Sequence, residues 1–212
     1  MARIAPFEKY TDRYDAWFVM HQAAYLSELE AVRQMLPQHG TGIEIGAGTG
    51  RFAAPLEISF GIEPCTAMSK TAVQRGVRII SGVGEYLPVR SGIFHYALMV
   101  TTVCFLDNIP QAFGEMNRIL HPGGSVLIGF VDRESVLGAM YESEKQKSRF
   151  YGDARFYSVG EITQYLETAG FSRFQYRQTL FSPLEKIRKA EPVKPGFGEG
   201  SFVAVSAVKR RI

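Results

Sequence analysis

Three glycines at alternate positions constrain this chain more than any other feature. Gly46, Gly48 and Gly50 follow a strand-like run over residues 41–46 and precede a run with helical character over residues 51–57. Because glycine has no Cβ, such a segment turns sharply and lets a ligand approach the backbone closely. The sequence therefore predicts a strand, a tight turn open to a ligand, and a helix in this part of the chain.

Strand-like and helix-like runs alternate along the rest of the chain, without an internal repeat or a dividing linker. Further strands are predicted at residues 59–63, 77–80, 94–100, 125–131, 171–181 and 201–209. This alternation predicts a parallel sheet with helices on both faces. Such sheets bind ligands beyond the carboxyl ends of their strands, where the strand order reverses.

Helices are predicted from apolar spacing and from residues that favour helix ends. Apolar residues three and four positions apart predict one helix over residues 7–36, which Pro37 and Gly40 end. Pro64 suits the first turn of a helix that reaches residue 75.

Later helices carry clearer caps. Asp107 or Asn108 can cap a helix that reaches residue 120, and residues 121–124 form a turn. Ser158 and Glu161 form a capping box for a helix that ends before the glycine at position 170.

Composition excludes several classes of protein. The 24 basic and 21 acidic residues leave a net charge of +3, which gives no reason to expect a nucleic acid partner. Cys65 and Cys104 have neither CxxC nor metal-ligand spacing, so we predict no metal site. The longest apolar stretch, residues 96–106, is far shorter than the roughly 18 residues of a membrane span. We expect a soluble cytoplasmic protein whose oligomeric state the sequence leaves open.

Two nucleotide-binding patterns compete for the glycine turn. Dinucleotide enzymes usually carry GxGxxG, but Arg51 stands where the third glycine of that pattern would fall. Glu44 lies two places before the first glycine, and Glu63 closes the predicted second strand. A carboxylate at that position can accept hydrogen bonds from both hydroxyls of a ribose.

The segment E-I-G-A-G-T-G-R-F resembles motif I of the class I S-adenosylmethionine-dependent methyltransferases, written E/D-x-G-x-G-x-G. Other blocks resemble the same family in the same order: G-I-E-P at 61–64, S-G-V-G-E-Y-L-P-V at 81–89, S-G-I-F-H at 91–95, R-I-L-H-P-G-G at 118–124, and the late helix ending A-G-F at 169–171. The similarity points to the ubiquinone/menaquinone-type (methyltransferase 11-like) branch.

This resemblance implies an α/β Rossmann-like three-layer sandwich. Its seven-stranded sheet would be mostly parallel, with an antiparallel last strand. Residues 1–212 would form a single methyltransferase domain, with residues 1–38 as an N-terminal helical cap and 132–157 as an acceptor-side insertion.

The resemblance also implies S-adenosylmethionine as cofactor, with S-adenosylhomocysteine as product. It assigns cofactor binding to Glu44, Gly46, Ala47, Gly48, Gly50, Glu63, Pro64, Val83, Gly84, Glu85 and Thr101. Glu44 would orient the glycine loop or serve as a buried structural carboxylate. Val83 departs from the family, which often has an aspartate for adenine there. Thr101 would lie beside the sulfonium or simply end its strand.

Methyl transfer needs alignment more than acid–base chemistry, since the leaving group is neutral. A base is required only if the acceptor must lose a proton. Weak catalytic candidates are Tyr14, His21 and Thr101, whereas His95 is expected to be structural. Aromatic residues of the cap and the insertion would line the acceptor pocket or serve mainly as packing.

The favoured function is methylation of a small molecule that the sequence does not identify. A non-catalytic S-adenosylmethionine-binding regulator is the alternative, and a nicotinamide-dependent oxidoreductase is a weaker one. Methylation of protein or RNA would favour an extended basic surface, for which the composition gives little support.

Overall fold

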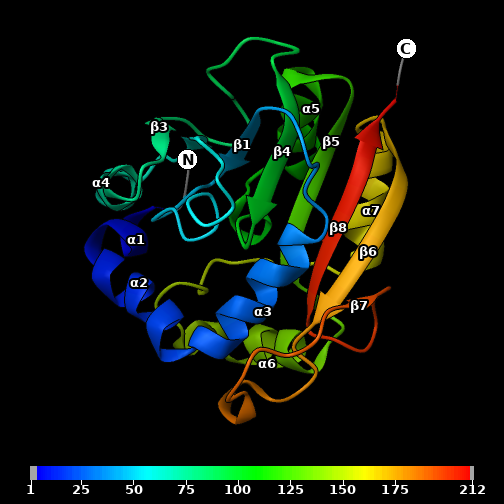
Figure 1. Ribbon diagram of the computed structural model, residues 1–212. Coiled ribbons are helices and arrows are strands. Elements are labelled where there is room, and N and C mark those ends of the chain that lie inside the picture. Colours follow the sequence, from blue (N-terminus) through cyan, green and yellow to red (C-terminus); the bar gives the residue numbers. More distant parts are fainter. Residues whose placement is uncertain (1–3, 211–212) are drawn as a thin grey trace.

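The computed structural model describes residues 4–210, and its strands form one mixed sheet (Figure 1). The strands are β1 (Gly42–Ile45), β2 (Phe60–Ile62), β3 (Arg78–Ile80), β4 (Phe94–Val100), β5 (Leu120–Val131), β6 (Phe171–Thr179), β7 (Lys194–Pro195) and β8 (Phe202–Lys209). Their order across the sheet is β3-β2-β1-β4-β5-β8-β6-β7.

The strand order reverses between β1 and β4, which places the ligand-binding end of the sheet there. Strands β1 to β5 pair in parallel, and β8 runs antiparallel to both β5 and β6. The mostly parallel sheet with an antiparallel last strand is thus confirmed. The expected seven strands become eight in the described part of the chain, because the two-residue β7 pairs with the end of β6.

Helices cover both faces of the sheet. The α-helices are α1 (Ala5–Lys9), α2 (Thr11–Met20), α3 (Gln22–Arg33), α4 (Thr66–Gln74), α5 (Ile109–Ile119), α6 (Val136–Glu144) and α7 (Val159–Thr168), and the 3₁₀ turns are η1 (Val103–Phe105), η2 (Lys145–Lys147) and η3 (Leu184–Lys186). Helix α3 lies across one face, and α5 and α7 lie on the other (Figure 1). None of the helices within residues 4–210 is both long and apolar enough to cross a membrane.

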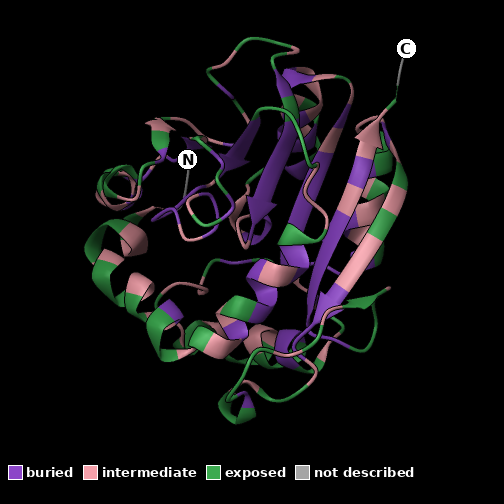
Figure 2. Ribbon diagram, in the orientation of Figure 1, coloured by how far each residue is buried: buried purple, intermediate pink, exposed green. Residues whose placement is uncertain are grey.

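The core lies on both sides of the central strands, which are buried throughout their middle (Figure 2). In β4, Leu98 and Val100 pack on the α3 side, whereas Ala97 and Met99 pack on the α5 side. Successive side chains of a strand point to opposite faces, so a strand covered on both faces is apolar without alternation. This explains the continuous apolar run of residues 96–100, which follows the exposed His95.

The single helix predicted over residues 7–36 is wrong, because the chain bends twice. Tyr10 and His21 leave helical geometry and separate α1, α2 and α3. Apolar spacing continues through both bends and does not reveal them. At the first bend Glu8 accepts hydrogen bonds from the amides of Thr66 (2.5 Å) and Ala67 (3.2 Å), which fixes α1 against the start of α4.

The helix predicted over residues 51–57 is also wrong, since that segment is a series of turns. Pro55 has no N–H to donate to the carbonyl of Arg51, as a helix would require. The Tyr25 hydroxyl of α3 donates to this carbonyl instead, at 2.5 Å. A positive φ of 58° at Glu57 then ends the segment.

The predicted caps are confirmed, but one turn is not. Asn108 accepts from the amide of Gln111 at the start of α5, and Ser158 and Glu161 form the capping box of α7. The turn predicted at 121–124 is instead the irregular start of β5, where pairing with β4 shifts register between Phe94 and Tyr96.

The packing of β1 on β4 gives a stability test. A Cβ on Gly42 would collide with the ring of its β4 neighbour Tyr96. We expect Gly42→Ala to lower the free energy of unfolding by about 1–3 kcal/mol through overpacking. Gly114→Ala on α5 is the control. Its added Cβ would have no neighbour within 4 Å, so this change should be neutral or slightly stabilising. Urea unfolding of both variants measures this, and equal stabilities would contradict the packing.

Candidate active site

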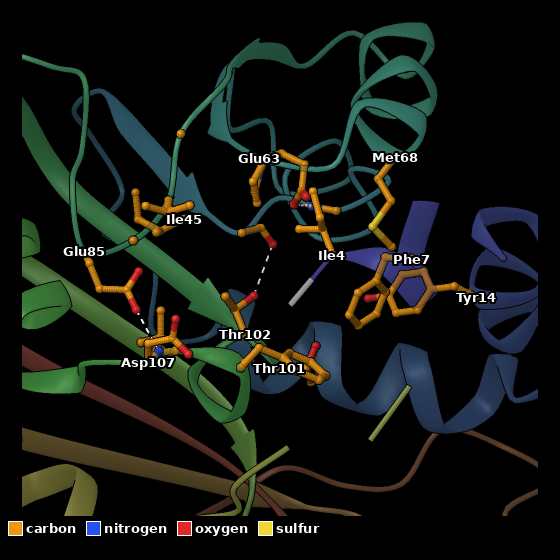
Figure 3. A pocket seen from close by; sticks show the side chains of 18 residues that line it. Ile4, Phe7, Tyr14, Ile45, Glu63, Met68, Glu85, Thr101, Thr102 and Asp107 are labelled. Carbon is orange, nitrogen blue, oxygen red and sulfur yellow. Dashed lines mark hydrogen bonds between the residues drawn. The ribbon is translucent and has the colours of Figure 1, made fainter. Parts of the chain in front are cut away.

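A pocket of about 720 Å³, counting its open mouth, lies beyond the carboxyl ends of β1, β2 and β4. Its walls come from the glycine loop after β1, the end of β2, the loop after β3, the segment after β4 and helices α1 and α2 (Figure 3). The pocket lies at the switch point that the strand order predicts.

The glycine loop is shaped by positive φ angles at Gly46 (74°), Gly48 (54°) and Gly50 (80°). A Cβ at Gly46 would also collide with the side chain of Thr102. The amides of Gly46 and Ala47 both donate to the carbonyl of Ile62, at 2.8 and 3.0 Å. The loop is therefore tied to the end of β2 and leaves its open side toward the pocket.

Glu63 follows β2 and reaches the pocket wall. Its two carboxylate oxygens accept from the amides of Gly48 and Cys65, each at 2.8 Å. Burial raises its pKa, and these two hydrogen bonds offset part of that rise. Each oxygen has a second lone pair, so Glu63 can also accept from the two hydroxyls of a ribose.

Glu44 lies below the glycine loop and does not line the pocket. Its carboxylate accepts from the amide of Ala53 at 2.8 Å, and burial raises its pKa well above the usual range. In this position it supports the turn segment behind the loop. Glu44 therefore has the position of a buried structural carboxylate, which was one of its two expected roles.

The opposite wall comes from the loop after β3. Val83, Gly84 and Glu85 line it, and Glu85 points across to Asp107, whose amide donates to it at 2.8 Å (Figure 3). Pro64 and Met68 add apolar surface. Val83 and Gly84 leave a narrow wall that suits a flat base, although the sequence lacks an aspartate at position 83.

Thr101 ends β4 with a φ of 51°, which is uncommon for a β-branched residue. Its amide donates to the carbonyl of Gly129 at 2.8 Å, which holds the turned backbone in place. The next residue, Thr102, donates to the carbonyl of Gly46 at 3.2 Å (Figure 3). Backbone strain of this kind is typical of ligand-binding sites.

Sequence reasoning missed an ion network behind the glycine loop. Asp15 accepts from the side chains of Arg51, Arg75 and Thr49. Burial alone would raise the pKa of Asp15, but the hydrogen bonds from Arg75 and Arg51 hold it well below its usual range. These residues are 34–60 positions apart from Asp15, so no local pattern links them. The network attaches α2 to the glycine loop and the segment after it.

A second cavity of about 980 Å³, counting its open mouth, adjoins the first. Phe7, Tyr14, Thr101 and Phe105 line both cavities. Most of the remaining wall comes from α2, α3, α6 and residues 150–151, which belong to the predicted cap and insertion, and β5 adds Val131. The two cavities thus meet at the end of β4.

Tyr14 lies at this junction (Figure 3). Burial raises the pKa of its hydroxyl, and the nearby carboxylates of Glu63 and Glu44 raise it further. The phenol therefore stays neutral near pH 7 and can donate a hydrogen bond, but it cannot act as an anionic base.

Glu28 of α3 lines the second cavity and was missed from the sequence. Only 4% of its surface is exposed, and burial raises its pKa to about 8. Its position four residues after Ala24 follows the buried stripe of α3, which includes Leu29 and Val32. That spacing was the signal that could have found it.

Other candidates lie outside both cavities. The bend between α2 and α3 turns His21 into a separate surface hollow near Ala190, where it packs against Trp17, so it is not placed to act as a base. His95 accepts from the amide of Thr41 at 3.0 Å, as expected for a structural residue. Cys104 also lies outside both cavities, and burial raises the pKa of its thiol to about 12, so it is not placed or ionised to act as a nucleophile.

A mixed sheet with this order and a pocket at its switch point is typical of the class I methyltransferase fold. Residues 43–128 match the family model described as "Methyltransferase domain". A crystal structure from Thermotoga maritima, described as an S-adenosylmethionine-dependent methyltransferase and a "possible histamine N-methyltransferase", is 47% identical, covers 98% of this chain and 100% of that chain, and has a TM-score of 0.96.

Two sequence relatives extend the comparison. An uncharacterized protein of Methanocaldococcus jannaschii is 44% identical over 203 residues, which are 96% of this chain and 98% of the relative. An uncharacterized methyltransferase of Bacillus pumilus is 25% identical over 207 residues, covering 87% of this chain and 96% of its own. The chain belongs to the class I S-adenosylmethionine-dependent methyltransferases, and S-adenosylmethionine is its cofactor.

The Asp15 network gives a second stability test. Replacing Asp15 by Asn removes the charge that pairs with Arg51 and Arg75, and hydrogen bonds to charged groups contribute about 1.5–3 kcal/mol each. The low pKa of Asp15 means that this stabilisation is present at neutral pH and is lost as pH falls below about 4. Asp15→Asn should therefore unfold at a lower urea concentration than the natural protein at pH 7. The gap between the two urea midpoints should shrink as the pH falls below about 4.

The buried Glu28 predicts an opposite pH effect. Its pKa is about 8 in the folded chain against an ordinary 4.5, so folding binds a proton between these values. The contribution of Glu28 to the free energy of unfolding is fully present below pH 4.5. It is lost as pH rises toward 8, by at most about 1.4 kcal/mol per pH unit. Glu28→Gln should flatten the fall in stability between pH 5 and 8. An unchanged slope in urea titrations would contradict the burial of an ionisable carboxyl.

Proposed function

We propose that this protein transfers the methyl group of S-adenosylmethionine to a small-molecule acceptor held in the second cavity. The observation that carries the proposal is the junction of the two cavities at Tyr14 and Thr101. A donor in the first cavity and an acceptor in the second would meet there. Displacement at a methyl carbon needs the two reactants in line, and oriented binding can supply about 7–11 kcal/mol of the barrier.

Residues of the first cavity fit the cofactor. In the glycine turn Gly46 and Gly48 line the first cavity and offer their backbone to the methionine part, whereas a Cβ on Gly50 would meet Ala72 of α4. Glu63 accepts from the ribose hydroxyls, and the Val83–Glu85 loop covers the base. Pro64 and Thr101 line the same cavity and complete the proposed contacts, while Ala47 and Glu44 do not line it and hold the loop from behind. S-adenosylmethionine supplies an electrophilic methyl group on a neutral leaving group.

Side chains around the junction exclude water and orient the acceptor. Phe7, Phe105 and Phe150 form an aromatic cluster there, with Phe7 5.1 Å from Phe105 and 5.3 Å from Phe150 between ring centroids. The neutral Tyr14 hydroxyl can donate a hydrogen bond to the acceptor. No strong base is required for an acceptor atom with a free lone pair.

The size and enclosure of the second cavity favour a small molecule over a protein or nucleic acid. The related Thermotoga maritima protein is described as a possible histamine N-methyltransferase, which makes small amines the first acceptors to test. A non-catalytic regulator is the second candidate, but it would have no need for an acceptor cavity that opens at the cofactor.

Calorimetric titration with S-adenosylmethionine, S-adenosylhomocysteine and NAD tests the cofactor site. We expect both sulfur compounds to bind and NAD not to bind. Glu63→Ala should weaken their binding by about 10- to 100-fold, since buried hydrogen bonds to a charged group are lost. Glu57→Ala, an exposed change at the end of the turn segment, serves as the control. Binding of NAD alone would overturn the proposal.

A further inference from the structure

We propose that Glu28 makes the second cavity selective for acceptors that carry a positive charge, such as an ammonium group or a protonated heterocycle. The proposal rests on the proposed function, because it names the acceptor class of the same site. It assigns Glu28 as a positioning residue that holds the charged part of the acceptor.

Glu28 differs from the other buried carboxylates in the described part of the chain. Glu44 and Glu63 accept backbone hydrogen bonds, and Asp132 accepts from the amide of Glu134 at 3.1 Å. No hydrogen bond or ion pair within residues 4–210 reaches the carboxyl group of Glu28, and burial is the only cause of its shifted pKa. Within the same residues no fully enclosed polar side-chain atom lacks a partner, so the oxygens of Glu28 open onto the cavity.

An unpaired carboxylate in a buried cavity is costly, and a hydrophobic side chain would fill the same space at lower cost. Because the carboxyl group of Glu28 opens onto the second cavity, we infer that a ligand bound there supplies the missing partner. The partner that stabilises a buried carboxylate best is a hydrogen-bonding cation.

The surroundings of Glu28 favour a cation as well. The cavity wall is mainly aromatic, formed by Tyr14, Trp17, Phe18, Tyr141, Phe150 and Tyr151. Tyr141 and Tyr151 stack with ring centroids 5.3 Å apart, and the charge of Glu28 raises the pKa of both hydroxyls in addition to burial. Aromatic faces attract ammonium and guanidinium groups. A carboxylate among aromatic faces therefore selects a compact organic cation.

The cavity's other charged residue does not replace this partner. Arg13 lies in the wall but is exposed, and it makes no contribution to the pKa of Glu28. The phenols of Tyr14, Tyr25, Tyr141 and Tyr151, whose pKa values burial raises, remain neutral near pH 7. Glu28 is thus the group in the cavity wall that would lose a proton when a cation binds.

The test compares amines with alcohols of the same shape, in the presence of saturating S-adenosylhomocysteine. Tyramine is paired with tyrosol, and 2-phenylethylamine with 2-phenylethanol. We expect calorimetry at pH 7 to show that each amine binds about 10- to 100-fold more tightly than its alcohol. Amine binding should release close to one proton, because it ionises a carboxyl group with a pKa of about 8. Titrations in buffers with different ionisation enthalpies measure this release.

Glu28→Gln keeps the shape of the side chain and removes the charge. In this variant the preference for amines and the proton release should both disappear, while affinity for S-adenosylhomocysteine stays as in the natural protein. Glu30→Gln is the matched control, since Glu30 lies on the same helix but faces solvent and contacts Gln34 at 3.0 Å. It should retain the amine preference.

The outcomes separate the two proposals. Failure of the natural protein to bind S-adenosylhomocysteine would overturn the proposed function. If the cofactor product binds but amines bind no better than alcohols, or neither binds, the cation proposal is wrong. It is also wrong if Glu28→Gln keeps the amine preference.

Discussion

The carbonyl of Ile62 accepts two hydrogen bonds, from the amides of Gly46 and Ala47, and Glu63 next to it accepts from the amide of Gly48. These contacts join the carboxyl ends of β1 and β2 and hold the glycine loop in its left-handed turn. The Glu63 carboxylate, which we propose binds the ribose, and the backbone of Gly46 and Gly48 are thereby fixed relative to each other. The rest of the site is arranged around this pair of strand ends.

The N-terminal helices and the insertion complete the site from outside the sheet. Asp15 binds the side chains of Arg51 and Arg75, so α2 is attached to the same loop that shapes the cofactor pocket. Helix α3 then carries Glu28 across the sheet face to the second cavity, where the aromatic side chains of α6 and residues 150–151 meet it. One scaffold therefore forms the two cavities that share Thr101, which we propose hold the cofactor and the acceptor.

Local patterns predicted the sheet and most of the loops that line the first cavity. The glycine turn, Glu63 and the capping box of Ser158 depend on residues near one another in sequence, so their types and spacing are sufficient. Features that depend on distant partners were missed. The bends at Tyr10 and His21 leave the apolar spacing intact, and the turns at 51–57 depend on Tyr25 from another helix. The Asp15 network and the unpaired state of Glu28 appear only when separate elements pack together.

A crystal structure of the protein with S-adenosylhomocysteine tests the central claim most directly. The account predicts both ribose hydroxyls within about 2.6–3.2 Å of the Glu63 oxygens. It also predicts that the sulfur faces Thr101 and the second cavity. A ligand bound elsewhere, or one whose sulfur points away from the junction at Tyr14 and Thr101, would contradict the account.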